Sequence, residues 1–133
     1  MATSFDPRES IVRVAPVRIV GPKRALDLTL FLDTGATHTM IDPGALAAVG
    51  YTVANLARST KVITVDGEVE RPFVRVQSLS ALDQARARLP VLAHRIDKQG
   101  KLGVSGLLGL DFLRRRRLIV DFRMGTIVLR SSR

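Results

Sequence analysis

The residue pattern with the clearest chemical potential is Asp33-Thr34-Gly35-Ala36-Thr37, which directly follows an apolar run. A carboxylate at the end of a buried strand can be held beside a second carboxylate, and such a pair can share one proton. The ionised member then takes a proton from water while the protonated member donates to a carbonyl oxygen, and together they hydrolyse a peptide bond. Gly35 would allow a close backbone approach, and the Thr34 hydroxyl could tie two such loops together.

This motif occurs once in the chain. Asp66 and Asp121 also lie in β-prone runs, but neither is followed by Thr-Gly. An enzyme with both halves in one chain would need two motifs and a much longer sequence. The single Asp33 therefore predicts a C2 homodimer, in which each copy supplies one carboxylate at the symmetry axis.

The elements that must position Asp33 are predicted to be strands. Leucine fills every second position from 26 to 32, and this alternation indicates a strand with one buried face. A run rich in Val and Ile precedes it at residues 11–20, where Pro16 indicates an edge strand or a bulge. The Asp66-Gly67 pair between two β-prone runs is a strong hairpin signal.

The rest of the chain continues an all-β pattern with little helix. Asp42-Pro43 favours the start of a short helix, and Gly50 favours its end. The other expected elements are strands at residues 61–65, 68–76, 85–94, 118–122 and 126–129, and short helices at 44–49 and 111–116. Because no repeat or linker interrupts them, one domain is expected over residues 1–133, with its core at about 11–130.

The chain resembles the retropepsin-like aspartic proteases, and in particular their single-domain bacterial members. The likeness spans about residues 11–129 and follows the order of motifs in that family. It rests on Leu32 to Thr37 around the aspartate, the hairpin at Asp66-Gly67, the run Gly106-Leu107-Leu108-Gly109-Leu110-Asp111-Phe112-Leu113, and Val120-Asp121-Phe122 with the closing hairpin.

The resemblance implies an all-β, homodimeric acid-protease barrel with one or two short helices, acting as an aspartic endopeptidase on protein or peptide substrates. It implies no cofactor and no metal. The catalytic residues that it implies are Asp33, Thr34 and Gly35. The residues that it places against substrate are Ala36, Thr37, Val65, Asp66 and Gly67, with Asp66-Gly67 at the tip of a flap. The run from Gly106 to Gly109 would pack behind the catalytic loop.

The chain departs from the retroviral pattern in three places. Retroviral enzymes often carry an acidic residue after Asp-Thr-Gly-Ala that pairs with an arginine after the late glycine, whereas these positions hold Thr37 and Leu110 here. The flap tip has one glycine, Gly67. The chain closes with a hairpin at residues 118–129 rather than a lone interface strand, so we expect the dimer interface to be built differently.

Composition narrows the other possible functions. The 133 residues include no cysteine, which excludes disulfides and cysteine nucleophiles. It also fits a reducing compartment, so we expect a cytoplasmic location, with a membrane anchor outside this chain as the alternative. No apolar run reaches the roughly 20 residues that a membrane span needs.

The two histidines, His38 and His94, show no metal-ligand spacing. His38 is interpreted first as a surface or hydrogen-bonded residue and second as a substrate contact.

The net charge of +9 raises the question of a nucleic-acid partner. The chain has one tyrosine, no tryptophan and no aromatic pattern suited to stacking bases, so such a partner is not expected. The four arginines from Arg114 to Arg117 are expected on the solvated face of the second helix, or as a contact for an acidic partner.

Two alternatives to the protease follow from these observations. One is a non-catalytic peptide-binding or dimerisation module of the same fold, and the other is a basic RNA-binding barrel. The intact Asp33-Thr34-Gly35 triplet argues against the first, and the second leaves that triplet without a purpose.

Overall fold

The alternating leucines form a strand that lies near the centre of the molecule. The computed structural model describes residues 2–52 and 58–131. In it, β3 (Ala25–Leu32) pairs antiparallel with β2 (Arg13–Val20), and Val14, Val17 and Leu30 from these strands are fully buried. The strand predicted from the period-two pattern is thus confirmed, and it ends one residue before Asp33.

Most other elements are also strands. They are β1 (Thr3–Ser4), β4 (Met40–Ile41), β5 (Ser59–Thr64), β6 (Gly67–Arg75), β7 (Ser78–Ala81), β8 (Gln84–Ala87), β9 (Pro90–Ala93), β10 (Gly106–Leu108), β11 (Arg116–Asp121) and β12 (Thr126–Ser131), with helices α1 (Pro43–Ala48) and α2 (Leu110–Leu113). The all-β class with two short helices is therefore confirmed.

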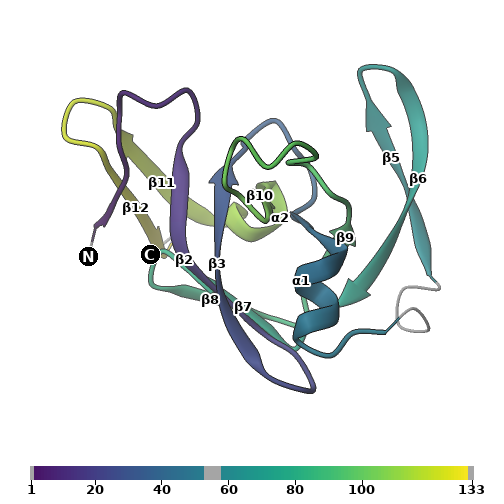
Figure 1. The fold of residues 1–133 in the computed structure, drawn as a ribbon. Coiled ribbons are helices and arrows are strands. Elements are labelled where there is room, and N and C mark those ends of the chain that lie inside the picture. The colour runs from purple at the N-terminus through teal and green to yellow at the C-terminus, as the bar shows by residue number, and fades with distance from the viewer. Residues whose placement is uncertain (1, 53–57, 132–133) are drawn as a thin grey trace.

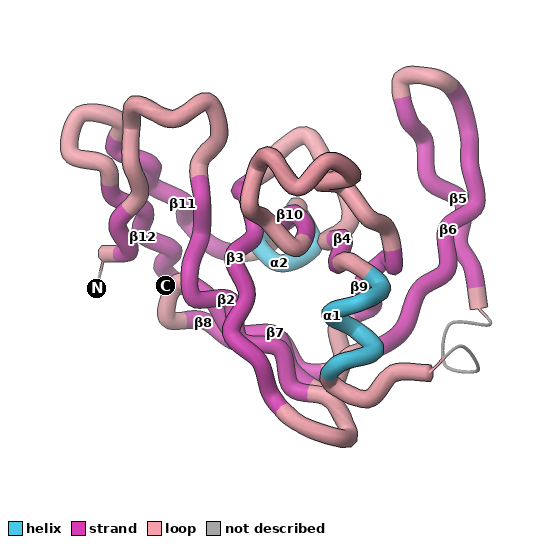
Figure 2. The backbone as a smooth tube through the Cα atoms, viewed as in Figure 1, coloured by secondary structure: helices cyan, strands magenta, loops and turns pink. Residues whose placement is uncertain are grey.

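The strands form one large curved sheet and one small sheet. The large sheet has the order β5-β6-β9-β4-β10-β3-β2-β7-β8, and the small sheet has the order β1-β12-β11. Figure 1 shows the small sheet on one side of the body and the β5–β6 hairpin projecting on the other. Figure 2 shows β3, β10, β4 and α2 grouped between them. The large sheet curves into a half-barrel. The core against it includes Leu46, Phe112 and Ile127.

Pro16 marks a bulge and not an edge. The register between β2 and β3 shifts between Val14 and Val17. β2 is an internal strand, because β7 pairs with its other side at residues 18–20. Pro16 lies outside that paired segment, so its missing N–H leaves no ladder bond to β7 unmade.

The first helix follows its predicted caps. The Asp42 side chain accepts a hydrogen bond from the Gly44 N–H at 2.8 Å, Pro43 opens the helix, and Gly50 follows its end with φ of +109°. Leu46 is the buried residue through which α1 packs against the core.

The second helix is shorter than predicted. It ends at Leu113, and Arg115 adopts a φ of +61°, which no helix tolerates. The Arg86 guanidinium donates to the Phe112 carbonyl oxygen at 2.9 and 3.1 Å, and so satisfies a carbonyl at the helix end. Arg116 and Arg117 lie in β11, so the prediction that the four arginines share a helix face was wrong.

The predicted strand at residues 85–94 was also wrong, because it is two strands. β8 and β9 are separated at Arg88, where φ is +55°, and the buried Leu89. β9 then turns to pair with β6 on one side and β4 on the other. The short strands β1 and β7 had not been predicted from the sequence.

The predicted hairpin at Asp66-Gly67 forms, with its turn one residue earlier. Thr64 pairs with Gly67, so Val65 and Asp66 are the two loop residues. Gly67 has φ of +118°, and the Thr64 hydroxyl donates to its carbonyl oxygen at 2.9 Å. Ile63 and Val65 are 86% and 103% exposed, so this hairpin carries apolar side chains into solvent.

Within residues 2–52 and 58–131, no helix has the length and apolar character needed to cross a membrane.

A prediction follows for Gly106, at the start of β10. A Cβ atom here would overlap the Met40 carbonyl oxygen, and the backbone has φ of +151°. We expect Gly106→Ala to lower the free energy of unfolding by about 3 kcal/mol, because backbone rather than a flexible side chain must move. Gly100→Ala is the control, since Gly100 has φ of +68° but no atom within 4 Å of its Cβ position. It should cost about 1 kcal/mol in chemical denaturation, and equal losses in the two variants would contradict the close approach.

Candidate active site

Asp33 begins a tight loop that its own backbone and carboxylate help to hold. Its N–H donates to the Leu108 carbonyl oxygen at 3.0 Å, and its carbonyl accepts from the Ala36 N–H at 3.2 Å. The Oδ1 atom accepts from the Gly35 N–H at 2.9 Å. A Cβ at position 35 would lie 3.2 Å from Oδ1, so glycine at this position keeps the surroundings of the carboxylate open.

The run from Gly106 to Gly109 packs behind this loop, as predicted. The Leu110 N–H donates to the Ala36 carbonyl oxygen at 2.8 Å, and the Asp111 N–H donates to the Thr37 carbonyl oxygen at 3.2 Å. A Cβ at Gly109 would lie 2.9 Å from the Ala36 oxygen. Backbone hydrogen bonds therefore join the segments around Thr37 and Leu110, the two positions where retroviral enzymes often have an ion pair.

A buried hydroxyl joins the loop to α2. Thr39 is fully buried, and its N–H donates to the Asp111 carboxylate at 2.9 and 3.0 Å. Its hydroxyl donates to Asp111 Oδ1 at 2.7 Å and accepts from the Gly109 N–H at 3.1 Å. The Phe112 N–H adds a bond to Oδ1 at 2.8 Å. The Asp111 carboxylate thus joins Thr39 to α2 through charge-assisted hydrogen bonds.

A cleft of about 440 Å³ separates the loop from the β5–β6 hairpin. The residues that line it are Asp33, Gly35, Ala36, Thr37, His38, Met40, Lys61, Val62, Ile63, Thr64, Val65 and Leu107. Asp33 is the one carboxylate among them. No group of three or more metal-ligating side chains occurs in the described parts of the chain. One chain therefore presents a single carboxyl to the cleft.

A smaller cavity of about 170 Å³ meets the cleft at His38, which lines both. Its other walls are Thr60, Phe73, Arg75, Pro90 and Leu92. The Nδ1 atom of His38 is buried and has no hydrogen-bond partner among the described residues. His38 therefore has unused hydrogen-bonding capacity where the two cavities join, although the sequence favoured a surface or hydrogen-bonded residue.

His94, the second histidine, lies at the end of β9 near two cations. Burial lowers the pKa of His94, and the positive charges of Arg71 and Lys98 lower it further. The imidazole is therefore neutral at neutral pH. This side of the molecule is electropositive enough to disfavour a further cation.

The structure brings some predicted site residues to the cleft and leaves others outside it. Those that line the cleft are Asp33, Gly35, Ala36, Thr37 and Val65. Thr34, Asp66 and Gly67 are exposed and do not line it. Sequence reasoning missed Met40, Leu107 and the hairpin residues 61–64. Strand alternation could have indicated Val62 and Thr64, but nothing in the sequence shows which side of a hairpin faces the body.

Comparisons with known proteins agree with this fold. The sequence profile of a family described as aspartyl protease matches residues 15–112. No curated protein matches the chain. Among solved structures, 18 chains match. One is a retropepsin-like aspartic protease from Rickettsia conorii, with a TM-score of 0.68 and 15% sequence identity over 98% of this chain and 89% of that one.

The buried hydroxyl generates a prediction. Thr39→Val keeps the shape of the side chain but removes the hydroxyl from Asp111 and Gly109. We expect the free energy of unfolding to fall by about 1–3 kcal/mol, because a carboxylate and an N–H each lose a buried partner. Thr39→Ser is the control, since it keeps the hydroxyl and should cost less than Thr39→Val. If serine proved as damaging as valine in thermal and chemical denaturation, packing rather than hydrogen bonding would hold the loop.

Proposed function

Because the chain belongs to the aspartyl protease family, we propose that it is an endopeptidase whose active site forms between two copies of the chain. The observation that carries the proposal is the lone Asp33 carboxylate at the floor of a cleft under a hairpin. A water-activating pair needs two carboxyls. A second copy related by a two-fold axis supplies the other Asp33.

In the proposed reaction the two Asp33 carboxyls share one proton. The ionised carboxylate accepts a proton from water, whose oxygen attacks the carbonyl carbon of the peptide bond. The protonated carboxyl donates to the carbonyl oxygen, which gives a tetrahedral diol. Proton transfer to the amide nitrogen then lets the carbon–nitrogen bond break, and the dyad returns to its starting state. No bond forms between protein and substrate.

The parts of the loop have distinct roles in this proposal. Gly35 donates its N–H to Asp33 Oδ1 and leaves the carboxylate uncrowded, which positions it for proton transfer. Thr34 is exposed, and its hydroxyl makes no hydrogen bond within the described residues, so it is available to the partner copy. The backbone of Ala36 and Thr37 borders the cleft, where an extended peptide could align as an added strand.

The hairpin acts as the lid in this proposal. Val62, Thr64 and Val65 line the cleft opposite Asp33, while its tip projects from the body (Figure 1). Closing such a lid over a peptide would exclude water other than the attacking molecule. The exposed Ile63 and Val65 supply apolar surface that substrate or the partner copy would cover.

Asp33→Asn tests the chemistry. We expect it to lower kcat/KM for peptide cleavage by at least about 10³-fold, because an amide cannot take the proton from water. Circular dichroism and size-exclusion chromatography should match the wild type, since the Asp33 side chain is partly exposed. The readout is mass spectrometry of a mixed peptide library. Cleavage by the variant at near the wild-type rate would sink the assignment, and a wild type that binds peptides without cleaving them would favour the non-catalytic module.

Mixing experiments test the shared site. When wild type is equilibrated with an equal amount of Asp33→Asn, random pairing leaves about half of the wild-type chains in homodimers, so activity should fall by about half. An excess of the variant should abolish it. As a control, an equal amount of bovine serum albumin should have no effect. Activity that stays constant as the variant is added would mean that one chain suffices.

A further inference from the structure

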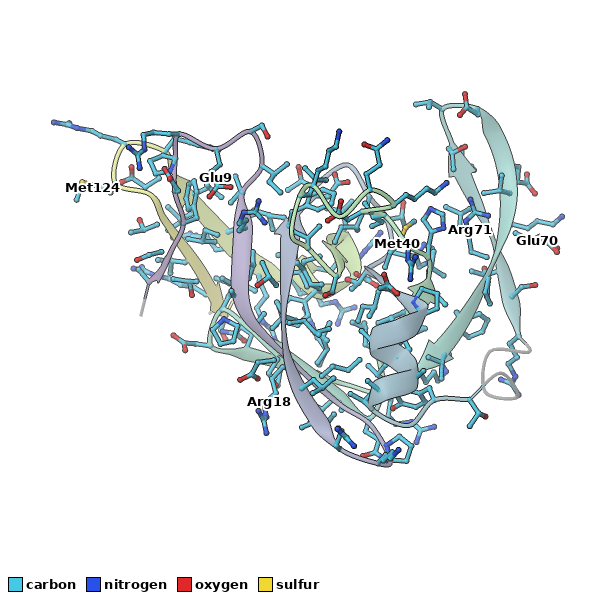
Figure 3. The ribbon with its side chains drawn as sticks, in the orientation of Figure 1. Glu9, Arg18, Met40, Glu70, Arg71 and Met124 are labelled. Atoms are coloured by element: carbon cyan, nitrogen blue, oxygen red, sulfur yellow. The ribbon has the colours of Figure 1, made fainter. Side chains whose placement is uncertain are left out.

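The β5–β6 hairpin separates its charges between its two faces. Because side chains alternate along a strand, Arg71, Phe73 and Arg75 share one face of β6, while Glu68 and Glu70 lie on the other. Figure 3 shows Arg71 on the side of the hairpin that faces the body, toward Met40, and Glu70 on the side away from it. The face toward the cleft therefore carries cations and the outer face carries carboxylates.

This inner face forms one end of the substrate cleft. Phe73 and Arg75 line the smaller cavity, and Thr60, which pairs with Arg71 in the β5–β6 register, lines it as well. His38 joins that cavity to the cleft that holds Asp33. Arg75 thus lines a cavity that meets the Asp33 cleft at His38.

The inner cations have no internal counter-charge. Arg71 donates to the Glu70 carbonyl oxygen and Arg75 to the Arg88 carbonyl oxygen, both at a long 3.4 Å. Neither forms an ion pair with a carboxylate of the described residues. By contrast, Lys61, which pairs with Glu70 in the hairpin register and also lines the cleft, lies 3.5 Å from Glu68. The hairpin therefore pairs Lys61 with a carboxylate and leaves Arg71 and Arg75 without one.

The body adds a further cation, Lys98, which like Arg71 lies near His94. The pKa of His94 is lowered by burial and by the nearby Arg71 and Lys98. The smaller cavity itself contains no carboxylate. An anion entering here therefore meets the Arg75 guanidinium, with Arg71 on the same face of β6, and no carboxylate among the groups that line the cavity.

We propose that this end of the cleft selects peptides with a glutamate or aspartate side chain a few residues from the scissile bond. The proposal rests on the proposed protease function and names its substrate class. Phe73, Pro90 and Leu92 form apolar walls for the methylene stem of such a side chain. Arg71 and Arg75 supply donors for its carboxylate, and His38 supplies a further polar group at the entrance.

Binding of labelled peptides to Asp33→Asn protein tests the proposal without requiring cleavage. Two sets of fluorescein-labelled decapeptides of Ala, Val, Leu, Phe and Ser would differ only in one scanned position, which is Glu in one set and Gln in the other. We expect at least one position at which Glu binds about tenfold more tightly than Gln by fluorescence anisotropy. The preference should shrink at high salt, since the cations are partly exposed.

Variants assign the preference to the inner face. Arg71→Gln should reduce the Glu-to-Gln ratio to about twofold or less, and Arg71→Glu should reverse it, so that the Gln peptide binds more tightly than the Glu peptide. Arg24→Gln is the matched control, because Arg24 is an exposed arginine in the turn between β2 and β3. The Glu-to-Gln ratio of Arg24→Gln should equal that of the parent Asp33→Asn protein. This result would show that losing one positive charge elsewhere does not remove the preference.

The outcomes separate this inference from the proposed function. No Glu preference at any position, no peptide binding at all, or a preference that survives both Arg71 variants would overturn the inference. If wild type cleaves peptides in an Asp33-dependent way without the preference, the protease assignment stands and the inference fails. If Glu peptides bind selectively through Arg71 but are never cleaved, the inference stands and the protease assignment fails.

Discussion

The hydrogen bonds between Thr39 and the Asp111 carboxylate are the constraint on which the site depends. The loop after Asp33 has no regular structure, so strand pairing cannot fix it. Instead the N–H and the hydroxyl of the buried Thr39 both donate hydrogen bonds to Asp111, and the hydroxyl oxygen accepts one from the Gly109 N–H. The Asp111 carboxylate accepts hydrogen bonds from N–H and O–H groups. Because hydrogen bonds are directional, they fix the position of the loop relative to α2 as well as stabilising it. Without this contact, the hydrogen bonds that hold the loop to the segment behind it would be backbone ones, at Asp33, Ala36 and Thr37.

The glycines act with this contact because they let three chain segments occupy the same small space. β10 lies between β3, to which it is parallel, and β4, to which it is antiparallel. At Gly106 and Gly109 the neighbouring backbone lies where a side chain would begin. β10 is only three residues long, yet it contacts both the strand that ends before Asp33 and the strand that follows the loop. A rigid support of this kind suits the proposed pairing of Asp33 with its copy in a second chain.

The sequence predicted the all-β class, the strand before Asp33, the first helix and both major hairpins, because each has a local signal. The β8–β9 break was missed because Arg88 adopts a positive φ without a glycine or asparagine to indicate it. The end of α2 was missed for the same reason at Arg115. The role of Asp111 was invisible, since its partner lies 72 positions away and no pattern in one sequence couples them. The same holds for the side of the hairpin that faces the cleft, which is set by how β6 docks on β9 and not by its own alternation.

The strict alternation along the hairpin links the charge of the cleft to its register. Arg71 and Glu70 are sequence neighbours that point to opposite sides (Figure 3). β6 pairs with β5 at residues 67–72 and with β9 at residues 73–75. Inserting or deleting one residue between these two parts of β6 would move every side chain of the projecting hairpin to its opposite face. The carboxylates of Glu68 and Glu70 would then face the cleft and Arg71 would face solvent. In evolution, one inserted codon could thus replace a cationic lid by an anionic one while Asp33 and its support stay unchanged, so that substrate choice could diverge faster than chemistry.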